Sequence, residues 1–303
     1  MNTDVEIITC TPGAQSENAK NTLQQIEKTF RQIESTLTRF NPDSELSRLN
    51  ASSGQAFKAS DVLYKVVQMA LEAAAETRGI FDPTILPGLI AAGYDRSFED
   101  LSQRLTLDSP KPAAVKGTSW RDISLDSASS TIFLPRGVTL DLGGIGKGWT
   151  VDYVCRYLKS FPGYALDAGG DIRLSGTQTD GSAWTVAIDD PFFKGHDLTV
   201  LRIYEGAVCT STTARRKWQL GGQWKHHLID PRSGQPSASG VVSATIIAES
   251  AARAEIIAKT SLILGPEEGL KFIRNQPNVR GLLVLEDGSL VRSRGLEEAC
   301  VVE

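Results

Sequence analysis

Helical patterns come early in this sequence and short strand patterns follow, and this order limits the fold more than any other feature. Apolar residues recur every three or four positions over residues 23–37, and a second helical pattern follows Ser60 and closes at Gly79. The rest is strand-rich, with candidate strands that include 138–142, and is interrupted by helical patterns after Lys147 and over 251–264. The order predicts an α+β fold with mainly antiparallel sheets flanked by helices, rather than a regular repeat of parallel strands and helices.

Size and charge limit the number of domains and the classes of partner. A chain of 303 residues with 41% hydrophobic and 22% charged residues has enough apolar side chains for a sizeable core, in one large domain or about two. Residues 95–120 are polar and interrupted by two prolines, which indicates a surface insertion or a seam between two lobes. The net charge of −4 gives no general attraction to nucleic acid or to anionic lipid.

Neither a membrane span nor a targeting signal is visible in the chain. No apolar run approaches the ~20 residues that a span needs, and the first ten residues contain neither a signal-peptide pattern nor a lipobox. Four cysteines lie far apart without a paired motif, which predicts reduced, mostly buried thiols and argues against a zinc site or a disulfide framework. A cytoplasmic location is therefore expected.

The strongest local feature is the glycine-rich segment from Thr139 to Trp149. It reads as a strand that ends at Leu142, a turn with four glycines in six residues, and the start of a helix at Lys147. Free N–H groups at a helix start attract phosphate, and Lys147 adds a cation, but the glycine spacing matches neither standard phosphate-binding motif. The segment alone favours an anion site and a tight packing turn about equally.

Three other segments have a structural and a functional interpretation each. Asp167 and Asp171 flank a Gly-Gly turn and serve either local hydrogen bonds or a ligand. Glu255 and Lys259 stand four apart on a helix in the order that favours an ion pair, and the alternative is that this helix presents polar groups to a ligand. His227 precedes the turn sequence Asp230 to Gly234, where a histidine is more often structural than catalytic.

Several motifs occur in one order along almost the whole chain, from about residue 1 to about residue 290. They are Phe40 to Asn50, Gly79 to Thr84, Asp141 to Gly148 with Asp152, Ala168 to Ile172, His227 to Pro236, and Ala254 to Gly265. In this order they resemble the ApbE family, the FAD:protein FMN transferases. The resemblance implies one ApbE-like domain over residues 1–303, with two lobes around a central FAD pocket.

The resemblance also implies a reaction. FAD is the substrate, Mg²⁺ assists cleavage of its pyrophosphate, and FMN passes to a Thr or Ser hydroxyl of a partner flavoprotein while AMP leaves. Such a transfer depends on charge neutralisation and positioning more than on covalent catalysis. Nucleic acid is not expected as a partner, and no membrane span is expected in the chain.

Motif by motif, the resemblance assigns residues to roles. Phe40 stands where the family has an aromatic side chain that stacks on the flavin ring. The flavin-binding positions are Met1, Phe40, Ala92, Gly93, Tyr94, Asp141, Lys147 and Ile229, and the catalytic candidates are His227, Asp230 and Lys147.

The sequence departs from the family at the metal site. The matched positions are Gly144, Glu255 and Lys259, where the last two stand for an Asp and a Thr four residues apart on the late helix. Glutamate can ligate magnesium, whereas a protonated lysine cannot. The departure leaves two alternatives to transfer: a protein that binds FAD without transferring FMN, and a pyrophosphatase that releases FMN and AMP.

Overall fold

The computed structural model describes residues 3–10, 16–102 and 119–301, and the chain forms two contact units. Unit 1 comprises Met1–Gln32, Lys147–Ala214 and Ser239–Glu303, and unit 2 comprises Ile33–Gly146 and Arg215–Ala238. Helix α1 (Ser16–Leu37) and helix α6 (Gly146–Cys155) each contain a change from one unit to the other. Most of the seam expected near 95–120 lies outside the described residues, and its described ends belong to unit 2.

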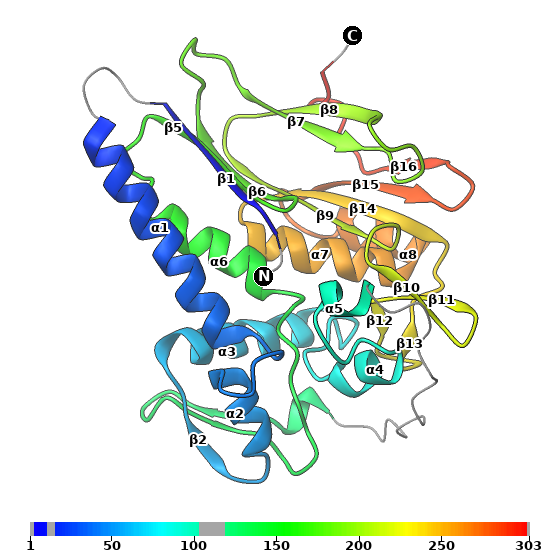
Figure 1. Ribbon diagram of the computed structural model, residues 1–303. Helices are drawn as coiled ribbons and strands as arrows, with labels where there is room; N and C mark the ends of the chain where they lie inside the picture. The colour runs from blue at the N-terminus through cyan, green and yellow to red at the C-terminus, as the bar shows by residue number, and fades with distance from the viewer. Residues whose placement is uncertain (1–2, 11–15, 103–118, 302–303) are drawn as a thin grey trace. The chain divides into compact units, whose positions relative to one another are not determined.

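Unit 1 is built on one seven-stranded antiparallel sheet, as the hairpin-rich sequence predicts (Figure 1). Its strand order is β1-β5-β6-β9-β14-β15-β16, and every neighbouring pair is antiparallel. The strands are β1 (Val5–Cys10), β5 (Gly163–Ala168), β6 (Asp171–Gly176), β9 (Gly206–Thr212), β14 (Val241–Ala248), β15 (Arg280–Leu285) and β16 (Leu290–Arg292).

Helices cover one face of this sheet and a hairpin covers the other. Helix α7 (Ala251–Leu264) packs on β9 and β14, and α8 (Pro266–Arg274) packs on α7 and β15. The hairpin of β7 (Trp184–Asp189) and β8 (Asp197–Ile203) buries Trp184 and Leu201 against Val208 of the sheet (Figure 1). Helix α7 thus packs against the sheet on one side and against α8 on another, and almost all of its side chains are buried.

The bounds of α7 follow from its caps. The Ser250 side chain accepts the N–H of Arg253 at the start of the helix, and Gly265 ends it with φ 89°. A left-handed residue at that position is typical of a helix end and favours glycine. The helix predicted over 251–264 is therefore confirmed residue for residue.

Unit 2 combines short helices with three small sheets. Ser44 and Ser60 cap two of these helices, since their side chains accept the N–H groups of Ser47 and Leu63. Its helices are α2 (Glu45–Ala51), α3 (Asp61–Glu76), α4 (Leu86–Ala91) and α5 (Phe98–Ser102), with a 3₁₀ turn at Trp120–Asp122. Its strands are β2 (Ala56–Lys58), β3 (Ser124–Asp126), β4 (Thr131–Phe133), β10 (Lys217–Leu220), β11 (Gln223–His226), β12 (Ile229–Asp230) and β13 (Gln235–Pro236).

The strand predicted over 138–142 is wrong. Side chains and loops, rather than a neighbouring strand, bond to the backbone of this segment. The Asn50 amide donates to the Leu140 carbonyl at 2.9 Å and accepts the Leu140 N–H at 2.7 Å, while the Asp141 N–H donates to the Pro83 carbonyl. One amide side chain thus makes the two bonds that a strand partner would make.

The α+β class with antiparallel sheets is confirmed. Within the described residues, no helix combines the length and the apolar character that crossing a membrane requires.

Candidate functional site

Unit 1 contains a buried ion pair at the start of α6. Lys147, the second residue of that helix, places its Nζ 3.0 Å from Asp171 Oδ2 and donates to the Gly169 carbonyl at 3.0 Å. The Lys147 side chain is 21% exposed and that of Asp171 only 3%. A charged carboxylate at such a buried position requires a counter-charge.

A second ion pair lies on α7. Lys259 Nζ is 2.7 Å from Glu255 Oε1, so the pair expected from the spacing forms. The other Glu255 oxygen, Oε2, accepts the Gly148 N–H at 3.0 Å, one residue after Lys147. Both oxygens of this buried carboxylate therefore have partners.

The two pairs interact electrostatically, and we call Lys147, Asp171, Glu255 and Lys259 the charge cluster. Burial and the charge of Glu255 together raise the pKa of Asp171 to about 6, although Lys147 and Lys259 oppose the rise. Burial would lower the pKa of Lys147, but the carboxylates of Asp171 and Glu255 raise it overall. The cluster thus alternates two cations with two anions.

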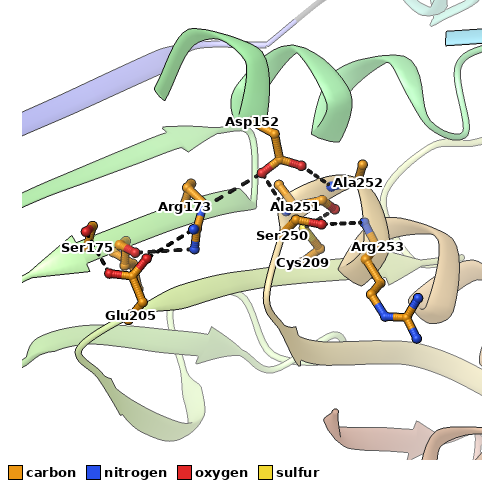
Figure 2. A network of polar contacts seen from close by, with 10 residues as sticks. Asp152, Arg173, Ser175, Glu205, Cys209, Ser250, Ala251, Ala252 and Arg253 are labelled. Carbon is orange, nitrogen blue, oxygen red and sulfur yellow. Dashed lines mark hydrogen bonds and ion pairs between the residues drawn. The ribbon is translucent and has the colours of Figure 1, made fainter. Parts of the chain in front are cut away.

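Helices α6 and α7 hold each other in place beside the cluster. Asp152 of α6 accepts the N–H groups of Ala251 and Ala252 at 2.9 Å each, which satisfies the first turn of α7 (Figure 2). In return, Glu255 of α7 accepts the Gly148 N–H in the first turn of α6. Each helix start thus receives a carboxylate from the other helix, a favourable arrangement of charge and dipole.

Further contacts extend from Asp152 into the sheet. Arg173 lies 3.9 Å from Asp152 and 3.1 Å from Glu205, and the Ser175 hydroxyl donates to Glu205 (Figure 2). Cys209 is buried beneath α7, where burial raises its pKa well above the usual value. Its thiol therefore stays neutral, in line with the inert buried thiols expected from the sequence.

Unit 2 contains an aromatic group around Arg39. Its Nε lies 2.7 Å from Asp141 Oδ2 and its Nη2 donates to the Tyr94 carbonyl at 2.7 Å. The same guanidinium lies 4.2 Å from the Phe40 ring centroid and 4.8 Å from that of Tyr94. Arg39 therefore brings together Phe40, Tyr94 and Asp141, three of the residues predicted to bind flavin.

Trp218 packs against the Tyr94 ring of this group. Its ring stacks on Tyr94 at 5.3 Å between centroids, and its indole N–H donates to the Ala92 carbonyl at 2.8 Å. Ile229 packs in the same apolar cluster as Ala92 and Tyr94, and Gly93 between them has φ 93°. Phe40 is 42% exposed while Tyr94 and Trp218 are buried, so the Phe40 ring is the part of the group open to a ligand.

Asp230, His227 and Gly144 are members of neither group. Asp230 forms a two-pronged ion pair with Arg232 inside its own turn; burial would raise its pKa, but Arg232 lowers it overall. The His227 ring is half-buried with Nδ1 away from solvent. Gly144 lies in the turn before α6, in unit 2, and Met1 lies outside the described residues.

The metal assignment does not fit the residues that the structure places there. The Lys259 ammonium already occupies one oxygen of Glu255, and a backbone N–H occupies the other. Over the described ranges, no group of three or more His, Cys, Asp or Glu side chains is arranged to hold a metal ion. Glu255 is thus engaged as a helix cap and counter-ion.

Sequence reasoning missed Arg39 and Trp218 as members of the aromatic group. Arg39 directly precedes Phe40, and this adjacency of a cation and an aromatic ring was the available signal. Nothing local connects Trp218 with Tyr94, because the two stand far apart in the chain and belong to different elements.

Comparison with known proteins gives consistent matches over nearly the whole chain. The sequence model of the ApbE family matches residues 1–283. An FAD:protein FMN transferase from Vibrio cholerae is 28% identical over 276 residues, which cover 89% of this chain and 82% of that protein.

Solved structures show the same fold. The flavin transferase ApbE from Vibrio cholerae superimposes with a TM-score of 0.82 at 26% identity, covering 99% of this chain and 96% of that chain. The ApbE protein from Thermotoga maritima gives a TM-score of 0.85 at 24% identity, covering 99% of this chain and 100% of that chain.

Proposed function

Because the chain belongs to the ApbE family, we propose that it is an FAD:protein FMN transferase. It takes FMN from FAD, attaches it to a Thr or Ser hydroxyl of a partner flavoprotein and releases AMP. The whole-length match to a named FAD:protein FMN transferase carries this proposal. Within unit 2, the aromatic group around Arg39 suits a flavin ring, and within unit 1, the charge cluster suits a phosphate group.

The reaction is a phosphoryl-type displacement. The acceptor oxygen forms a bond to the FMN phosphorus, the bridging bond of the pyrophosphate breaks, and its electron pair leaves with AMP. Because AMP takes that electron pair, negative charge builds up on the leaving phosphate, and the hydroxyl proton passes to a base or to solvent. A protein accelerates such a step chiefly by fixed positive charge and by alignment of the two oxygens.

We assign roles to this chain's residues accordingly. Phe40 stacks on the flavin, with Tyr94, Ala92, Gly93 and Ile229 forming the surface behind it, and Asp141 orders that surface through Arg39. Lys147 neutralises a phosphate, while His227 and Asp230 stay candidates for handling the proton of the acceptor hydroxyl. Met1 stays a predicted flavin contact. Magnesium is not part of the proposal, since Glu255 and Lys259 do not fit it.

The Glu255–Lys259 pair also favours a second candidate function, an FAD-binding protein without transfer activity. A pyrophosphatase that passes FMN to water is the third alternative. The products separate the three: flavinylated acceptor with AMP, intact FAD, or free FMN with AMP.

Incubation with FAD and an acceptor domain that carries a Thr site tests the transfer. We expect the acceptor to gain the mass of one FMN less one water, and AMP to form in equal amount, because the FMN phosphate becomes an ester. Intact mass spectrometry and chromatography of nucleotides measure the two products. The acceptor with Thr replaced by Ala is the control, and FMN with AMP but an unmodified acceptor identifies the pyrophosphatase.

Phe40→Ala tests the flavin surface. We expect FAD to bind less tightly by about 0.5–1.5 kcal/mol and its fluorescence to be quenched less, because an exposed aromatic partner is lost. Fluorescence titration measures both. Phe193→Ala, which removes a 65% exposed ring on the β7–β8 hairpin, is the matched control. Equal affinities in all three proteins would remove Phe40 from the flavin site.

A cytoplasmic location is proposed as well. All four cysteines are free thiols in the structure, which suits a reducing compartment.

A further inference from the structure

We propose that the Lys259 ammonium, held by Glu255, supplies the positive charge that the family resemblance assigns to a magnesium ion, so that this protein transfers FMN without a metal. The inference rests on the proposed function, because it names the cation that neutralises the pyrophosphate at that same site. It starts from the disagreement between the family's metal position and the residues that this chain places there.

The first observation is that both carboxylate oxygens of Glu255 already have partners. Oε1 lies 2.7 Å from the Lys259 ammonium and Oε2 accepts the Gly148 N–H, and the Glu255 side chain is only 3% exposed. A divalent ion at Glu255 would have to displace the ammonium and remain beside it, and like charges at such separation repel strongly. The carboxylate therefore holds Lys259 in place of a metal ion.

The neighbouring hydroxyl does not restore a ligand. Thr260 follows Lys259 directly, about 100° further round the helix. Its side chain is fully buried and its Oγ1 has no hydrogen-bond partner, so it points into the core of unit 1. The family's hydroxyl position is thus occupied by an amine, and the adjacent hydroxyl does not replace it.

The second observation is the matching arrangement of the two ion pairs. In each pair the carboxylate is buried, at 3% exposure, and the ammonium is more open, at 21% for Lys147 and 15% for Lys259. An anion that approaches from solvent therefore meets two ammonium groups and not the carboxylates. Two cations fixed by buried anions are the arrangement that a pyrophosphate requires.

The third observation is the rigidity of the support. Glu255 accepts the N–H of Gly148 in the first turn of α6. Asp152 accepts the N–H groups at the start of α7 (Figure 2). The Lys259 amine, paired with Glu255, is therefore held by two packed helices. A positive charge held in one place stabilises a leaving phosphate without reorganisation at the moment of reaction.

The first test uses the unaltered, metal-stripped protein. We expect FMN transfer at the same rate in excess EDTA as in Mg²⁺, and no Mn²⁺ bound by the flavin-free protein in electron paramagnetic resonance titrations. Transfer that stops in EDTA and returns with Mg²⁺ would overturn the inference, as would one tightly bound Mn²⁺ per chain.

The second test replaces Lys259 by Thr, the residue type that the family has at this position. In EDTA, Lys259→Thr should bind FAD on the order of 10- to 100-fold more weakly than the unaltered protein, the range expected for a lost hydrogen bond to a charged group, with riboflavin affinity unchanged. Lys259→Arg should retain FAD affinity, and the double variant Glu255→Asp/Lys259→Thr should gain Mn²⁺ binding and Mg²⁺-dependent transfer. Lys271→Thr, which breaks an exposed pair with Glu268, is the matched control.

These readouts separate the inference from the proposed function. If the unaltered protein transfers no FMN with or without Mg²⁺, the proposed function fails, and FAD and riboflavin affinities still judge the role of Lys259. Equal FAD affinity of the unaltered protein and Lys259→Thr in EDTA would overturn the inference. If Lys259→Thr does not fold by circular dichroism, Lys259→Met replaces it, and the first test needs no substitution.

Discussion

Lys147→Met is expected to lower the free energy of unfolding by about 3 kcal/mol at pH 8, because it leaves the Asp171 carboxylate buried without its cation. Charged groups around Asp171 cannot replace it fully, since Glu255 repels the carboxylate and Lys259 is already paired with Glu255. Urea unfolding followed by circular dichroism measures the loss. The double variant Lys147→Met/Asp171→Asn should recover part of it, and Lys271→Met is a surface control.

The loss of unfolding free energy in Lys147→Met should become smaller as the pH falls. Burial raises the pKa of folded Asp171 from 3.8 to about 6, so Asp171 contributes stability below its unfolded pKa that disappears as the pH rises through about 6. Without Lys147 the folded pKa rises further, because the cation that opposed the rise is gone. At pH 4 Asp171 is then protonated and Lys147→Met costs little. A loss that is the same at pH 4 and pH 8 would contradict a charged Asp171 as its cause.

Gly148→Ala should destabilise the protein by about 1–3 kcal/mol, the usual cost of overpacking, although alanine is the better helix former. A Cβ at Gly148 would lie 2.7 Å from the Ala251 carbonyl oxygen and 2.9 Å from the Ala252 Cα, which are backbone atoms of α7. Since a backbone cannot rotate aside, α6 must shift away from α7 and weaken the bond between the Gly148 N–H and Glu255.

Gly146→Ala, in the same helix, is the matched control. A Cβ there would lie 3.5 Å from Leu37 Cδ1, an ordinary contact, so we expect no loss of stability and a gain of up to about 1 kcal/mol. Urea unfolding of both variants makes the comparison. Equal stability of the two would show that the approach of α6 to α7 is looser than the structure indicates.

Local patterns predicted the local structure well. The bounds of α7 and the Glu255–Lys259 pair both depend on residues a few positions apart, and both are confirmed. The motif order predicted the family in the same way, because it records positions along the chain rather than contacts in space.

Contacts between distant residues could not be predicted from periodicity. The strand expected over 138–142 does not form, because the Asn50 side chain bonds the Leu140 N–H and carbonyl. No local sequence pattern predicts a contact with a residue so far away in the chain. The same holds for Arg39 with Asp141 and for Gly148 with Glu255. The pair Glu255 and Lys259 was visible in the sequence, but the second partner of that carboxylate, the Gly148 N–H, was not.

The strand order of the sheet in unit 1 determines when its edge strand can pair during synthesis. Edge strand β1 (Val5–Cys10) pairs with β5 (Gly163–Ala168), and residues 33–146 of unit 2 lie between them in the chain. During synthesis β1 therefore leaves the ribosome long before its partner exists, and closing so long a loop costs entropy before any pairing is gained. Strand β1 therefore stays unpaired in the nascent chain while residues 33–146 of unit 2 are being synthesised.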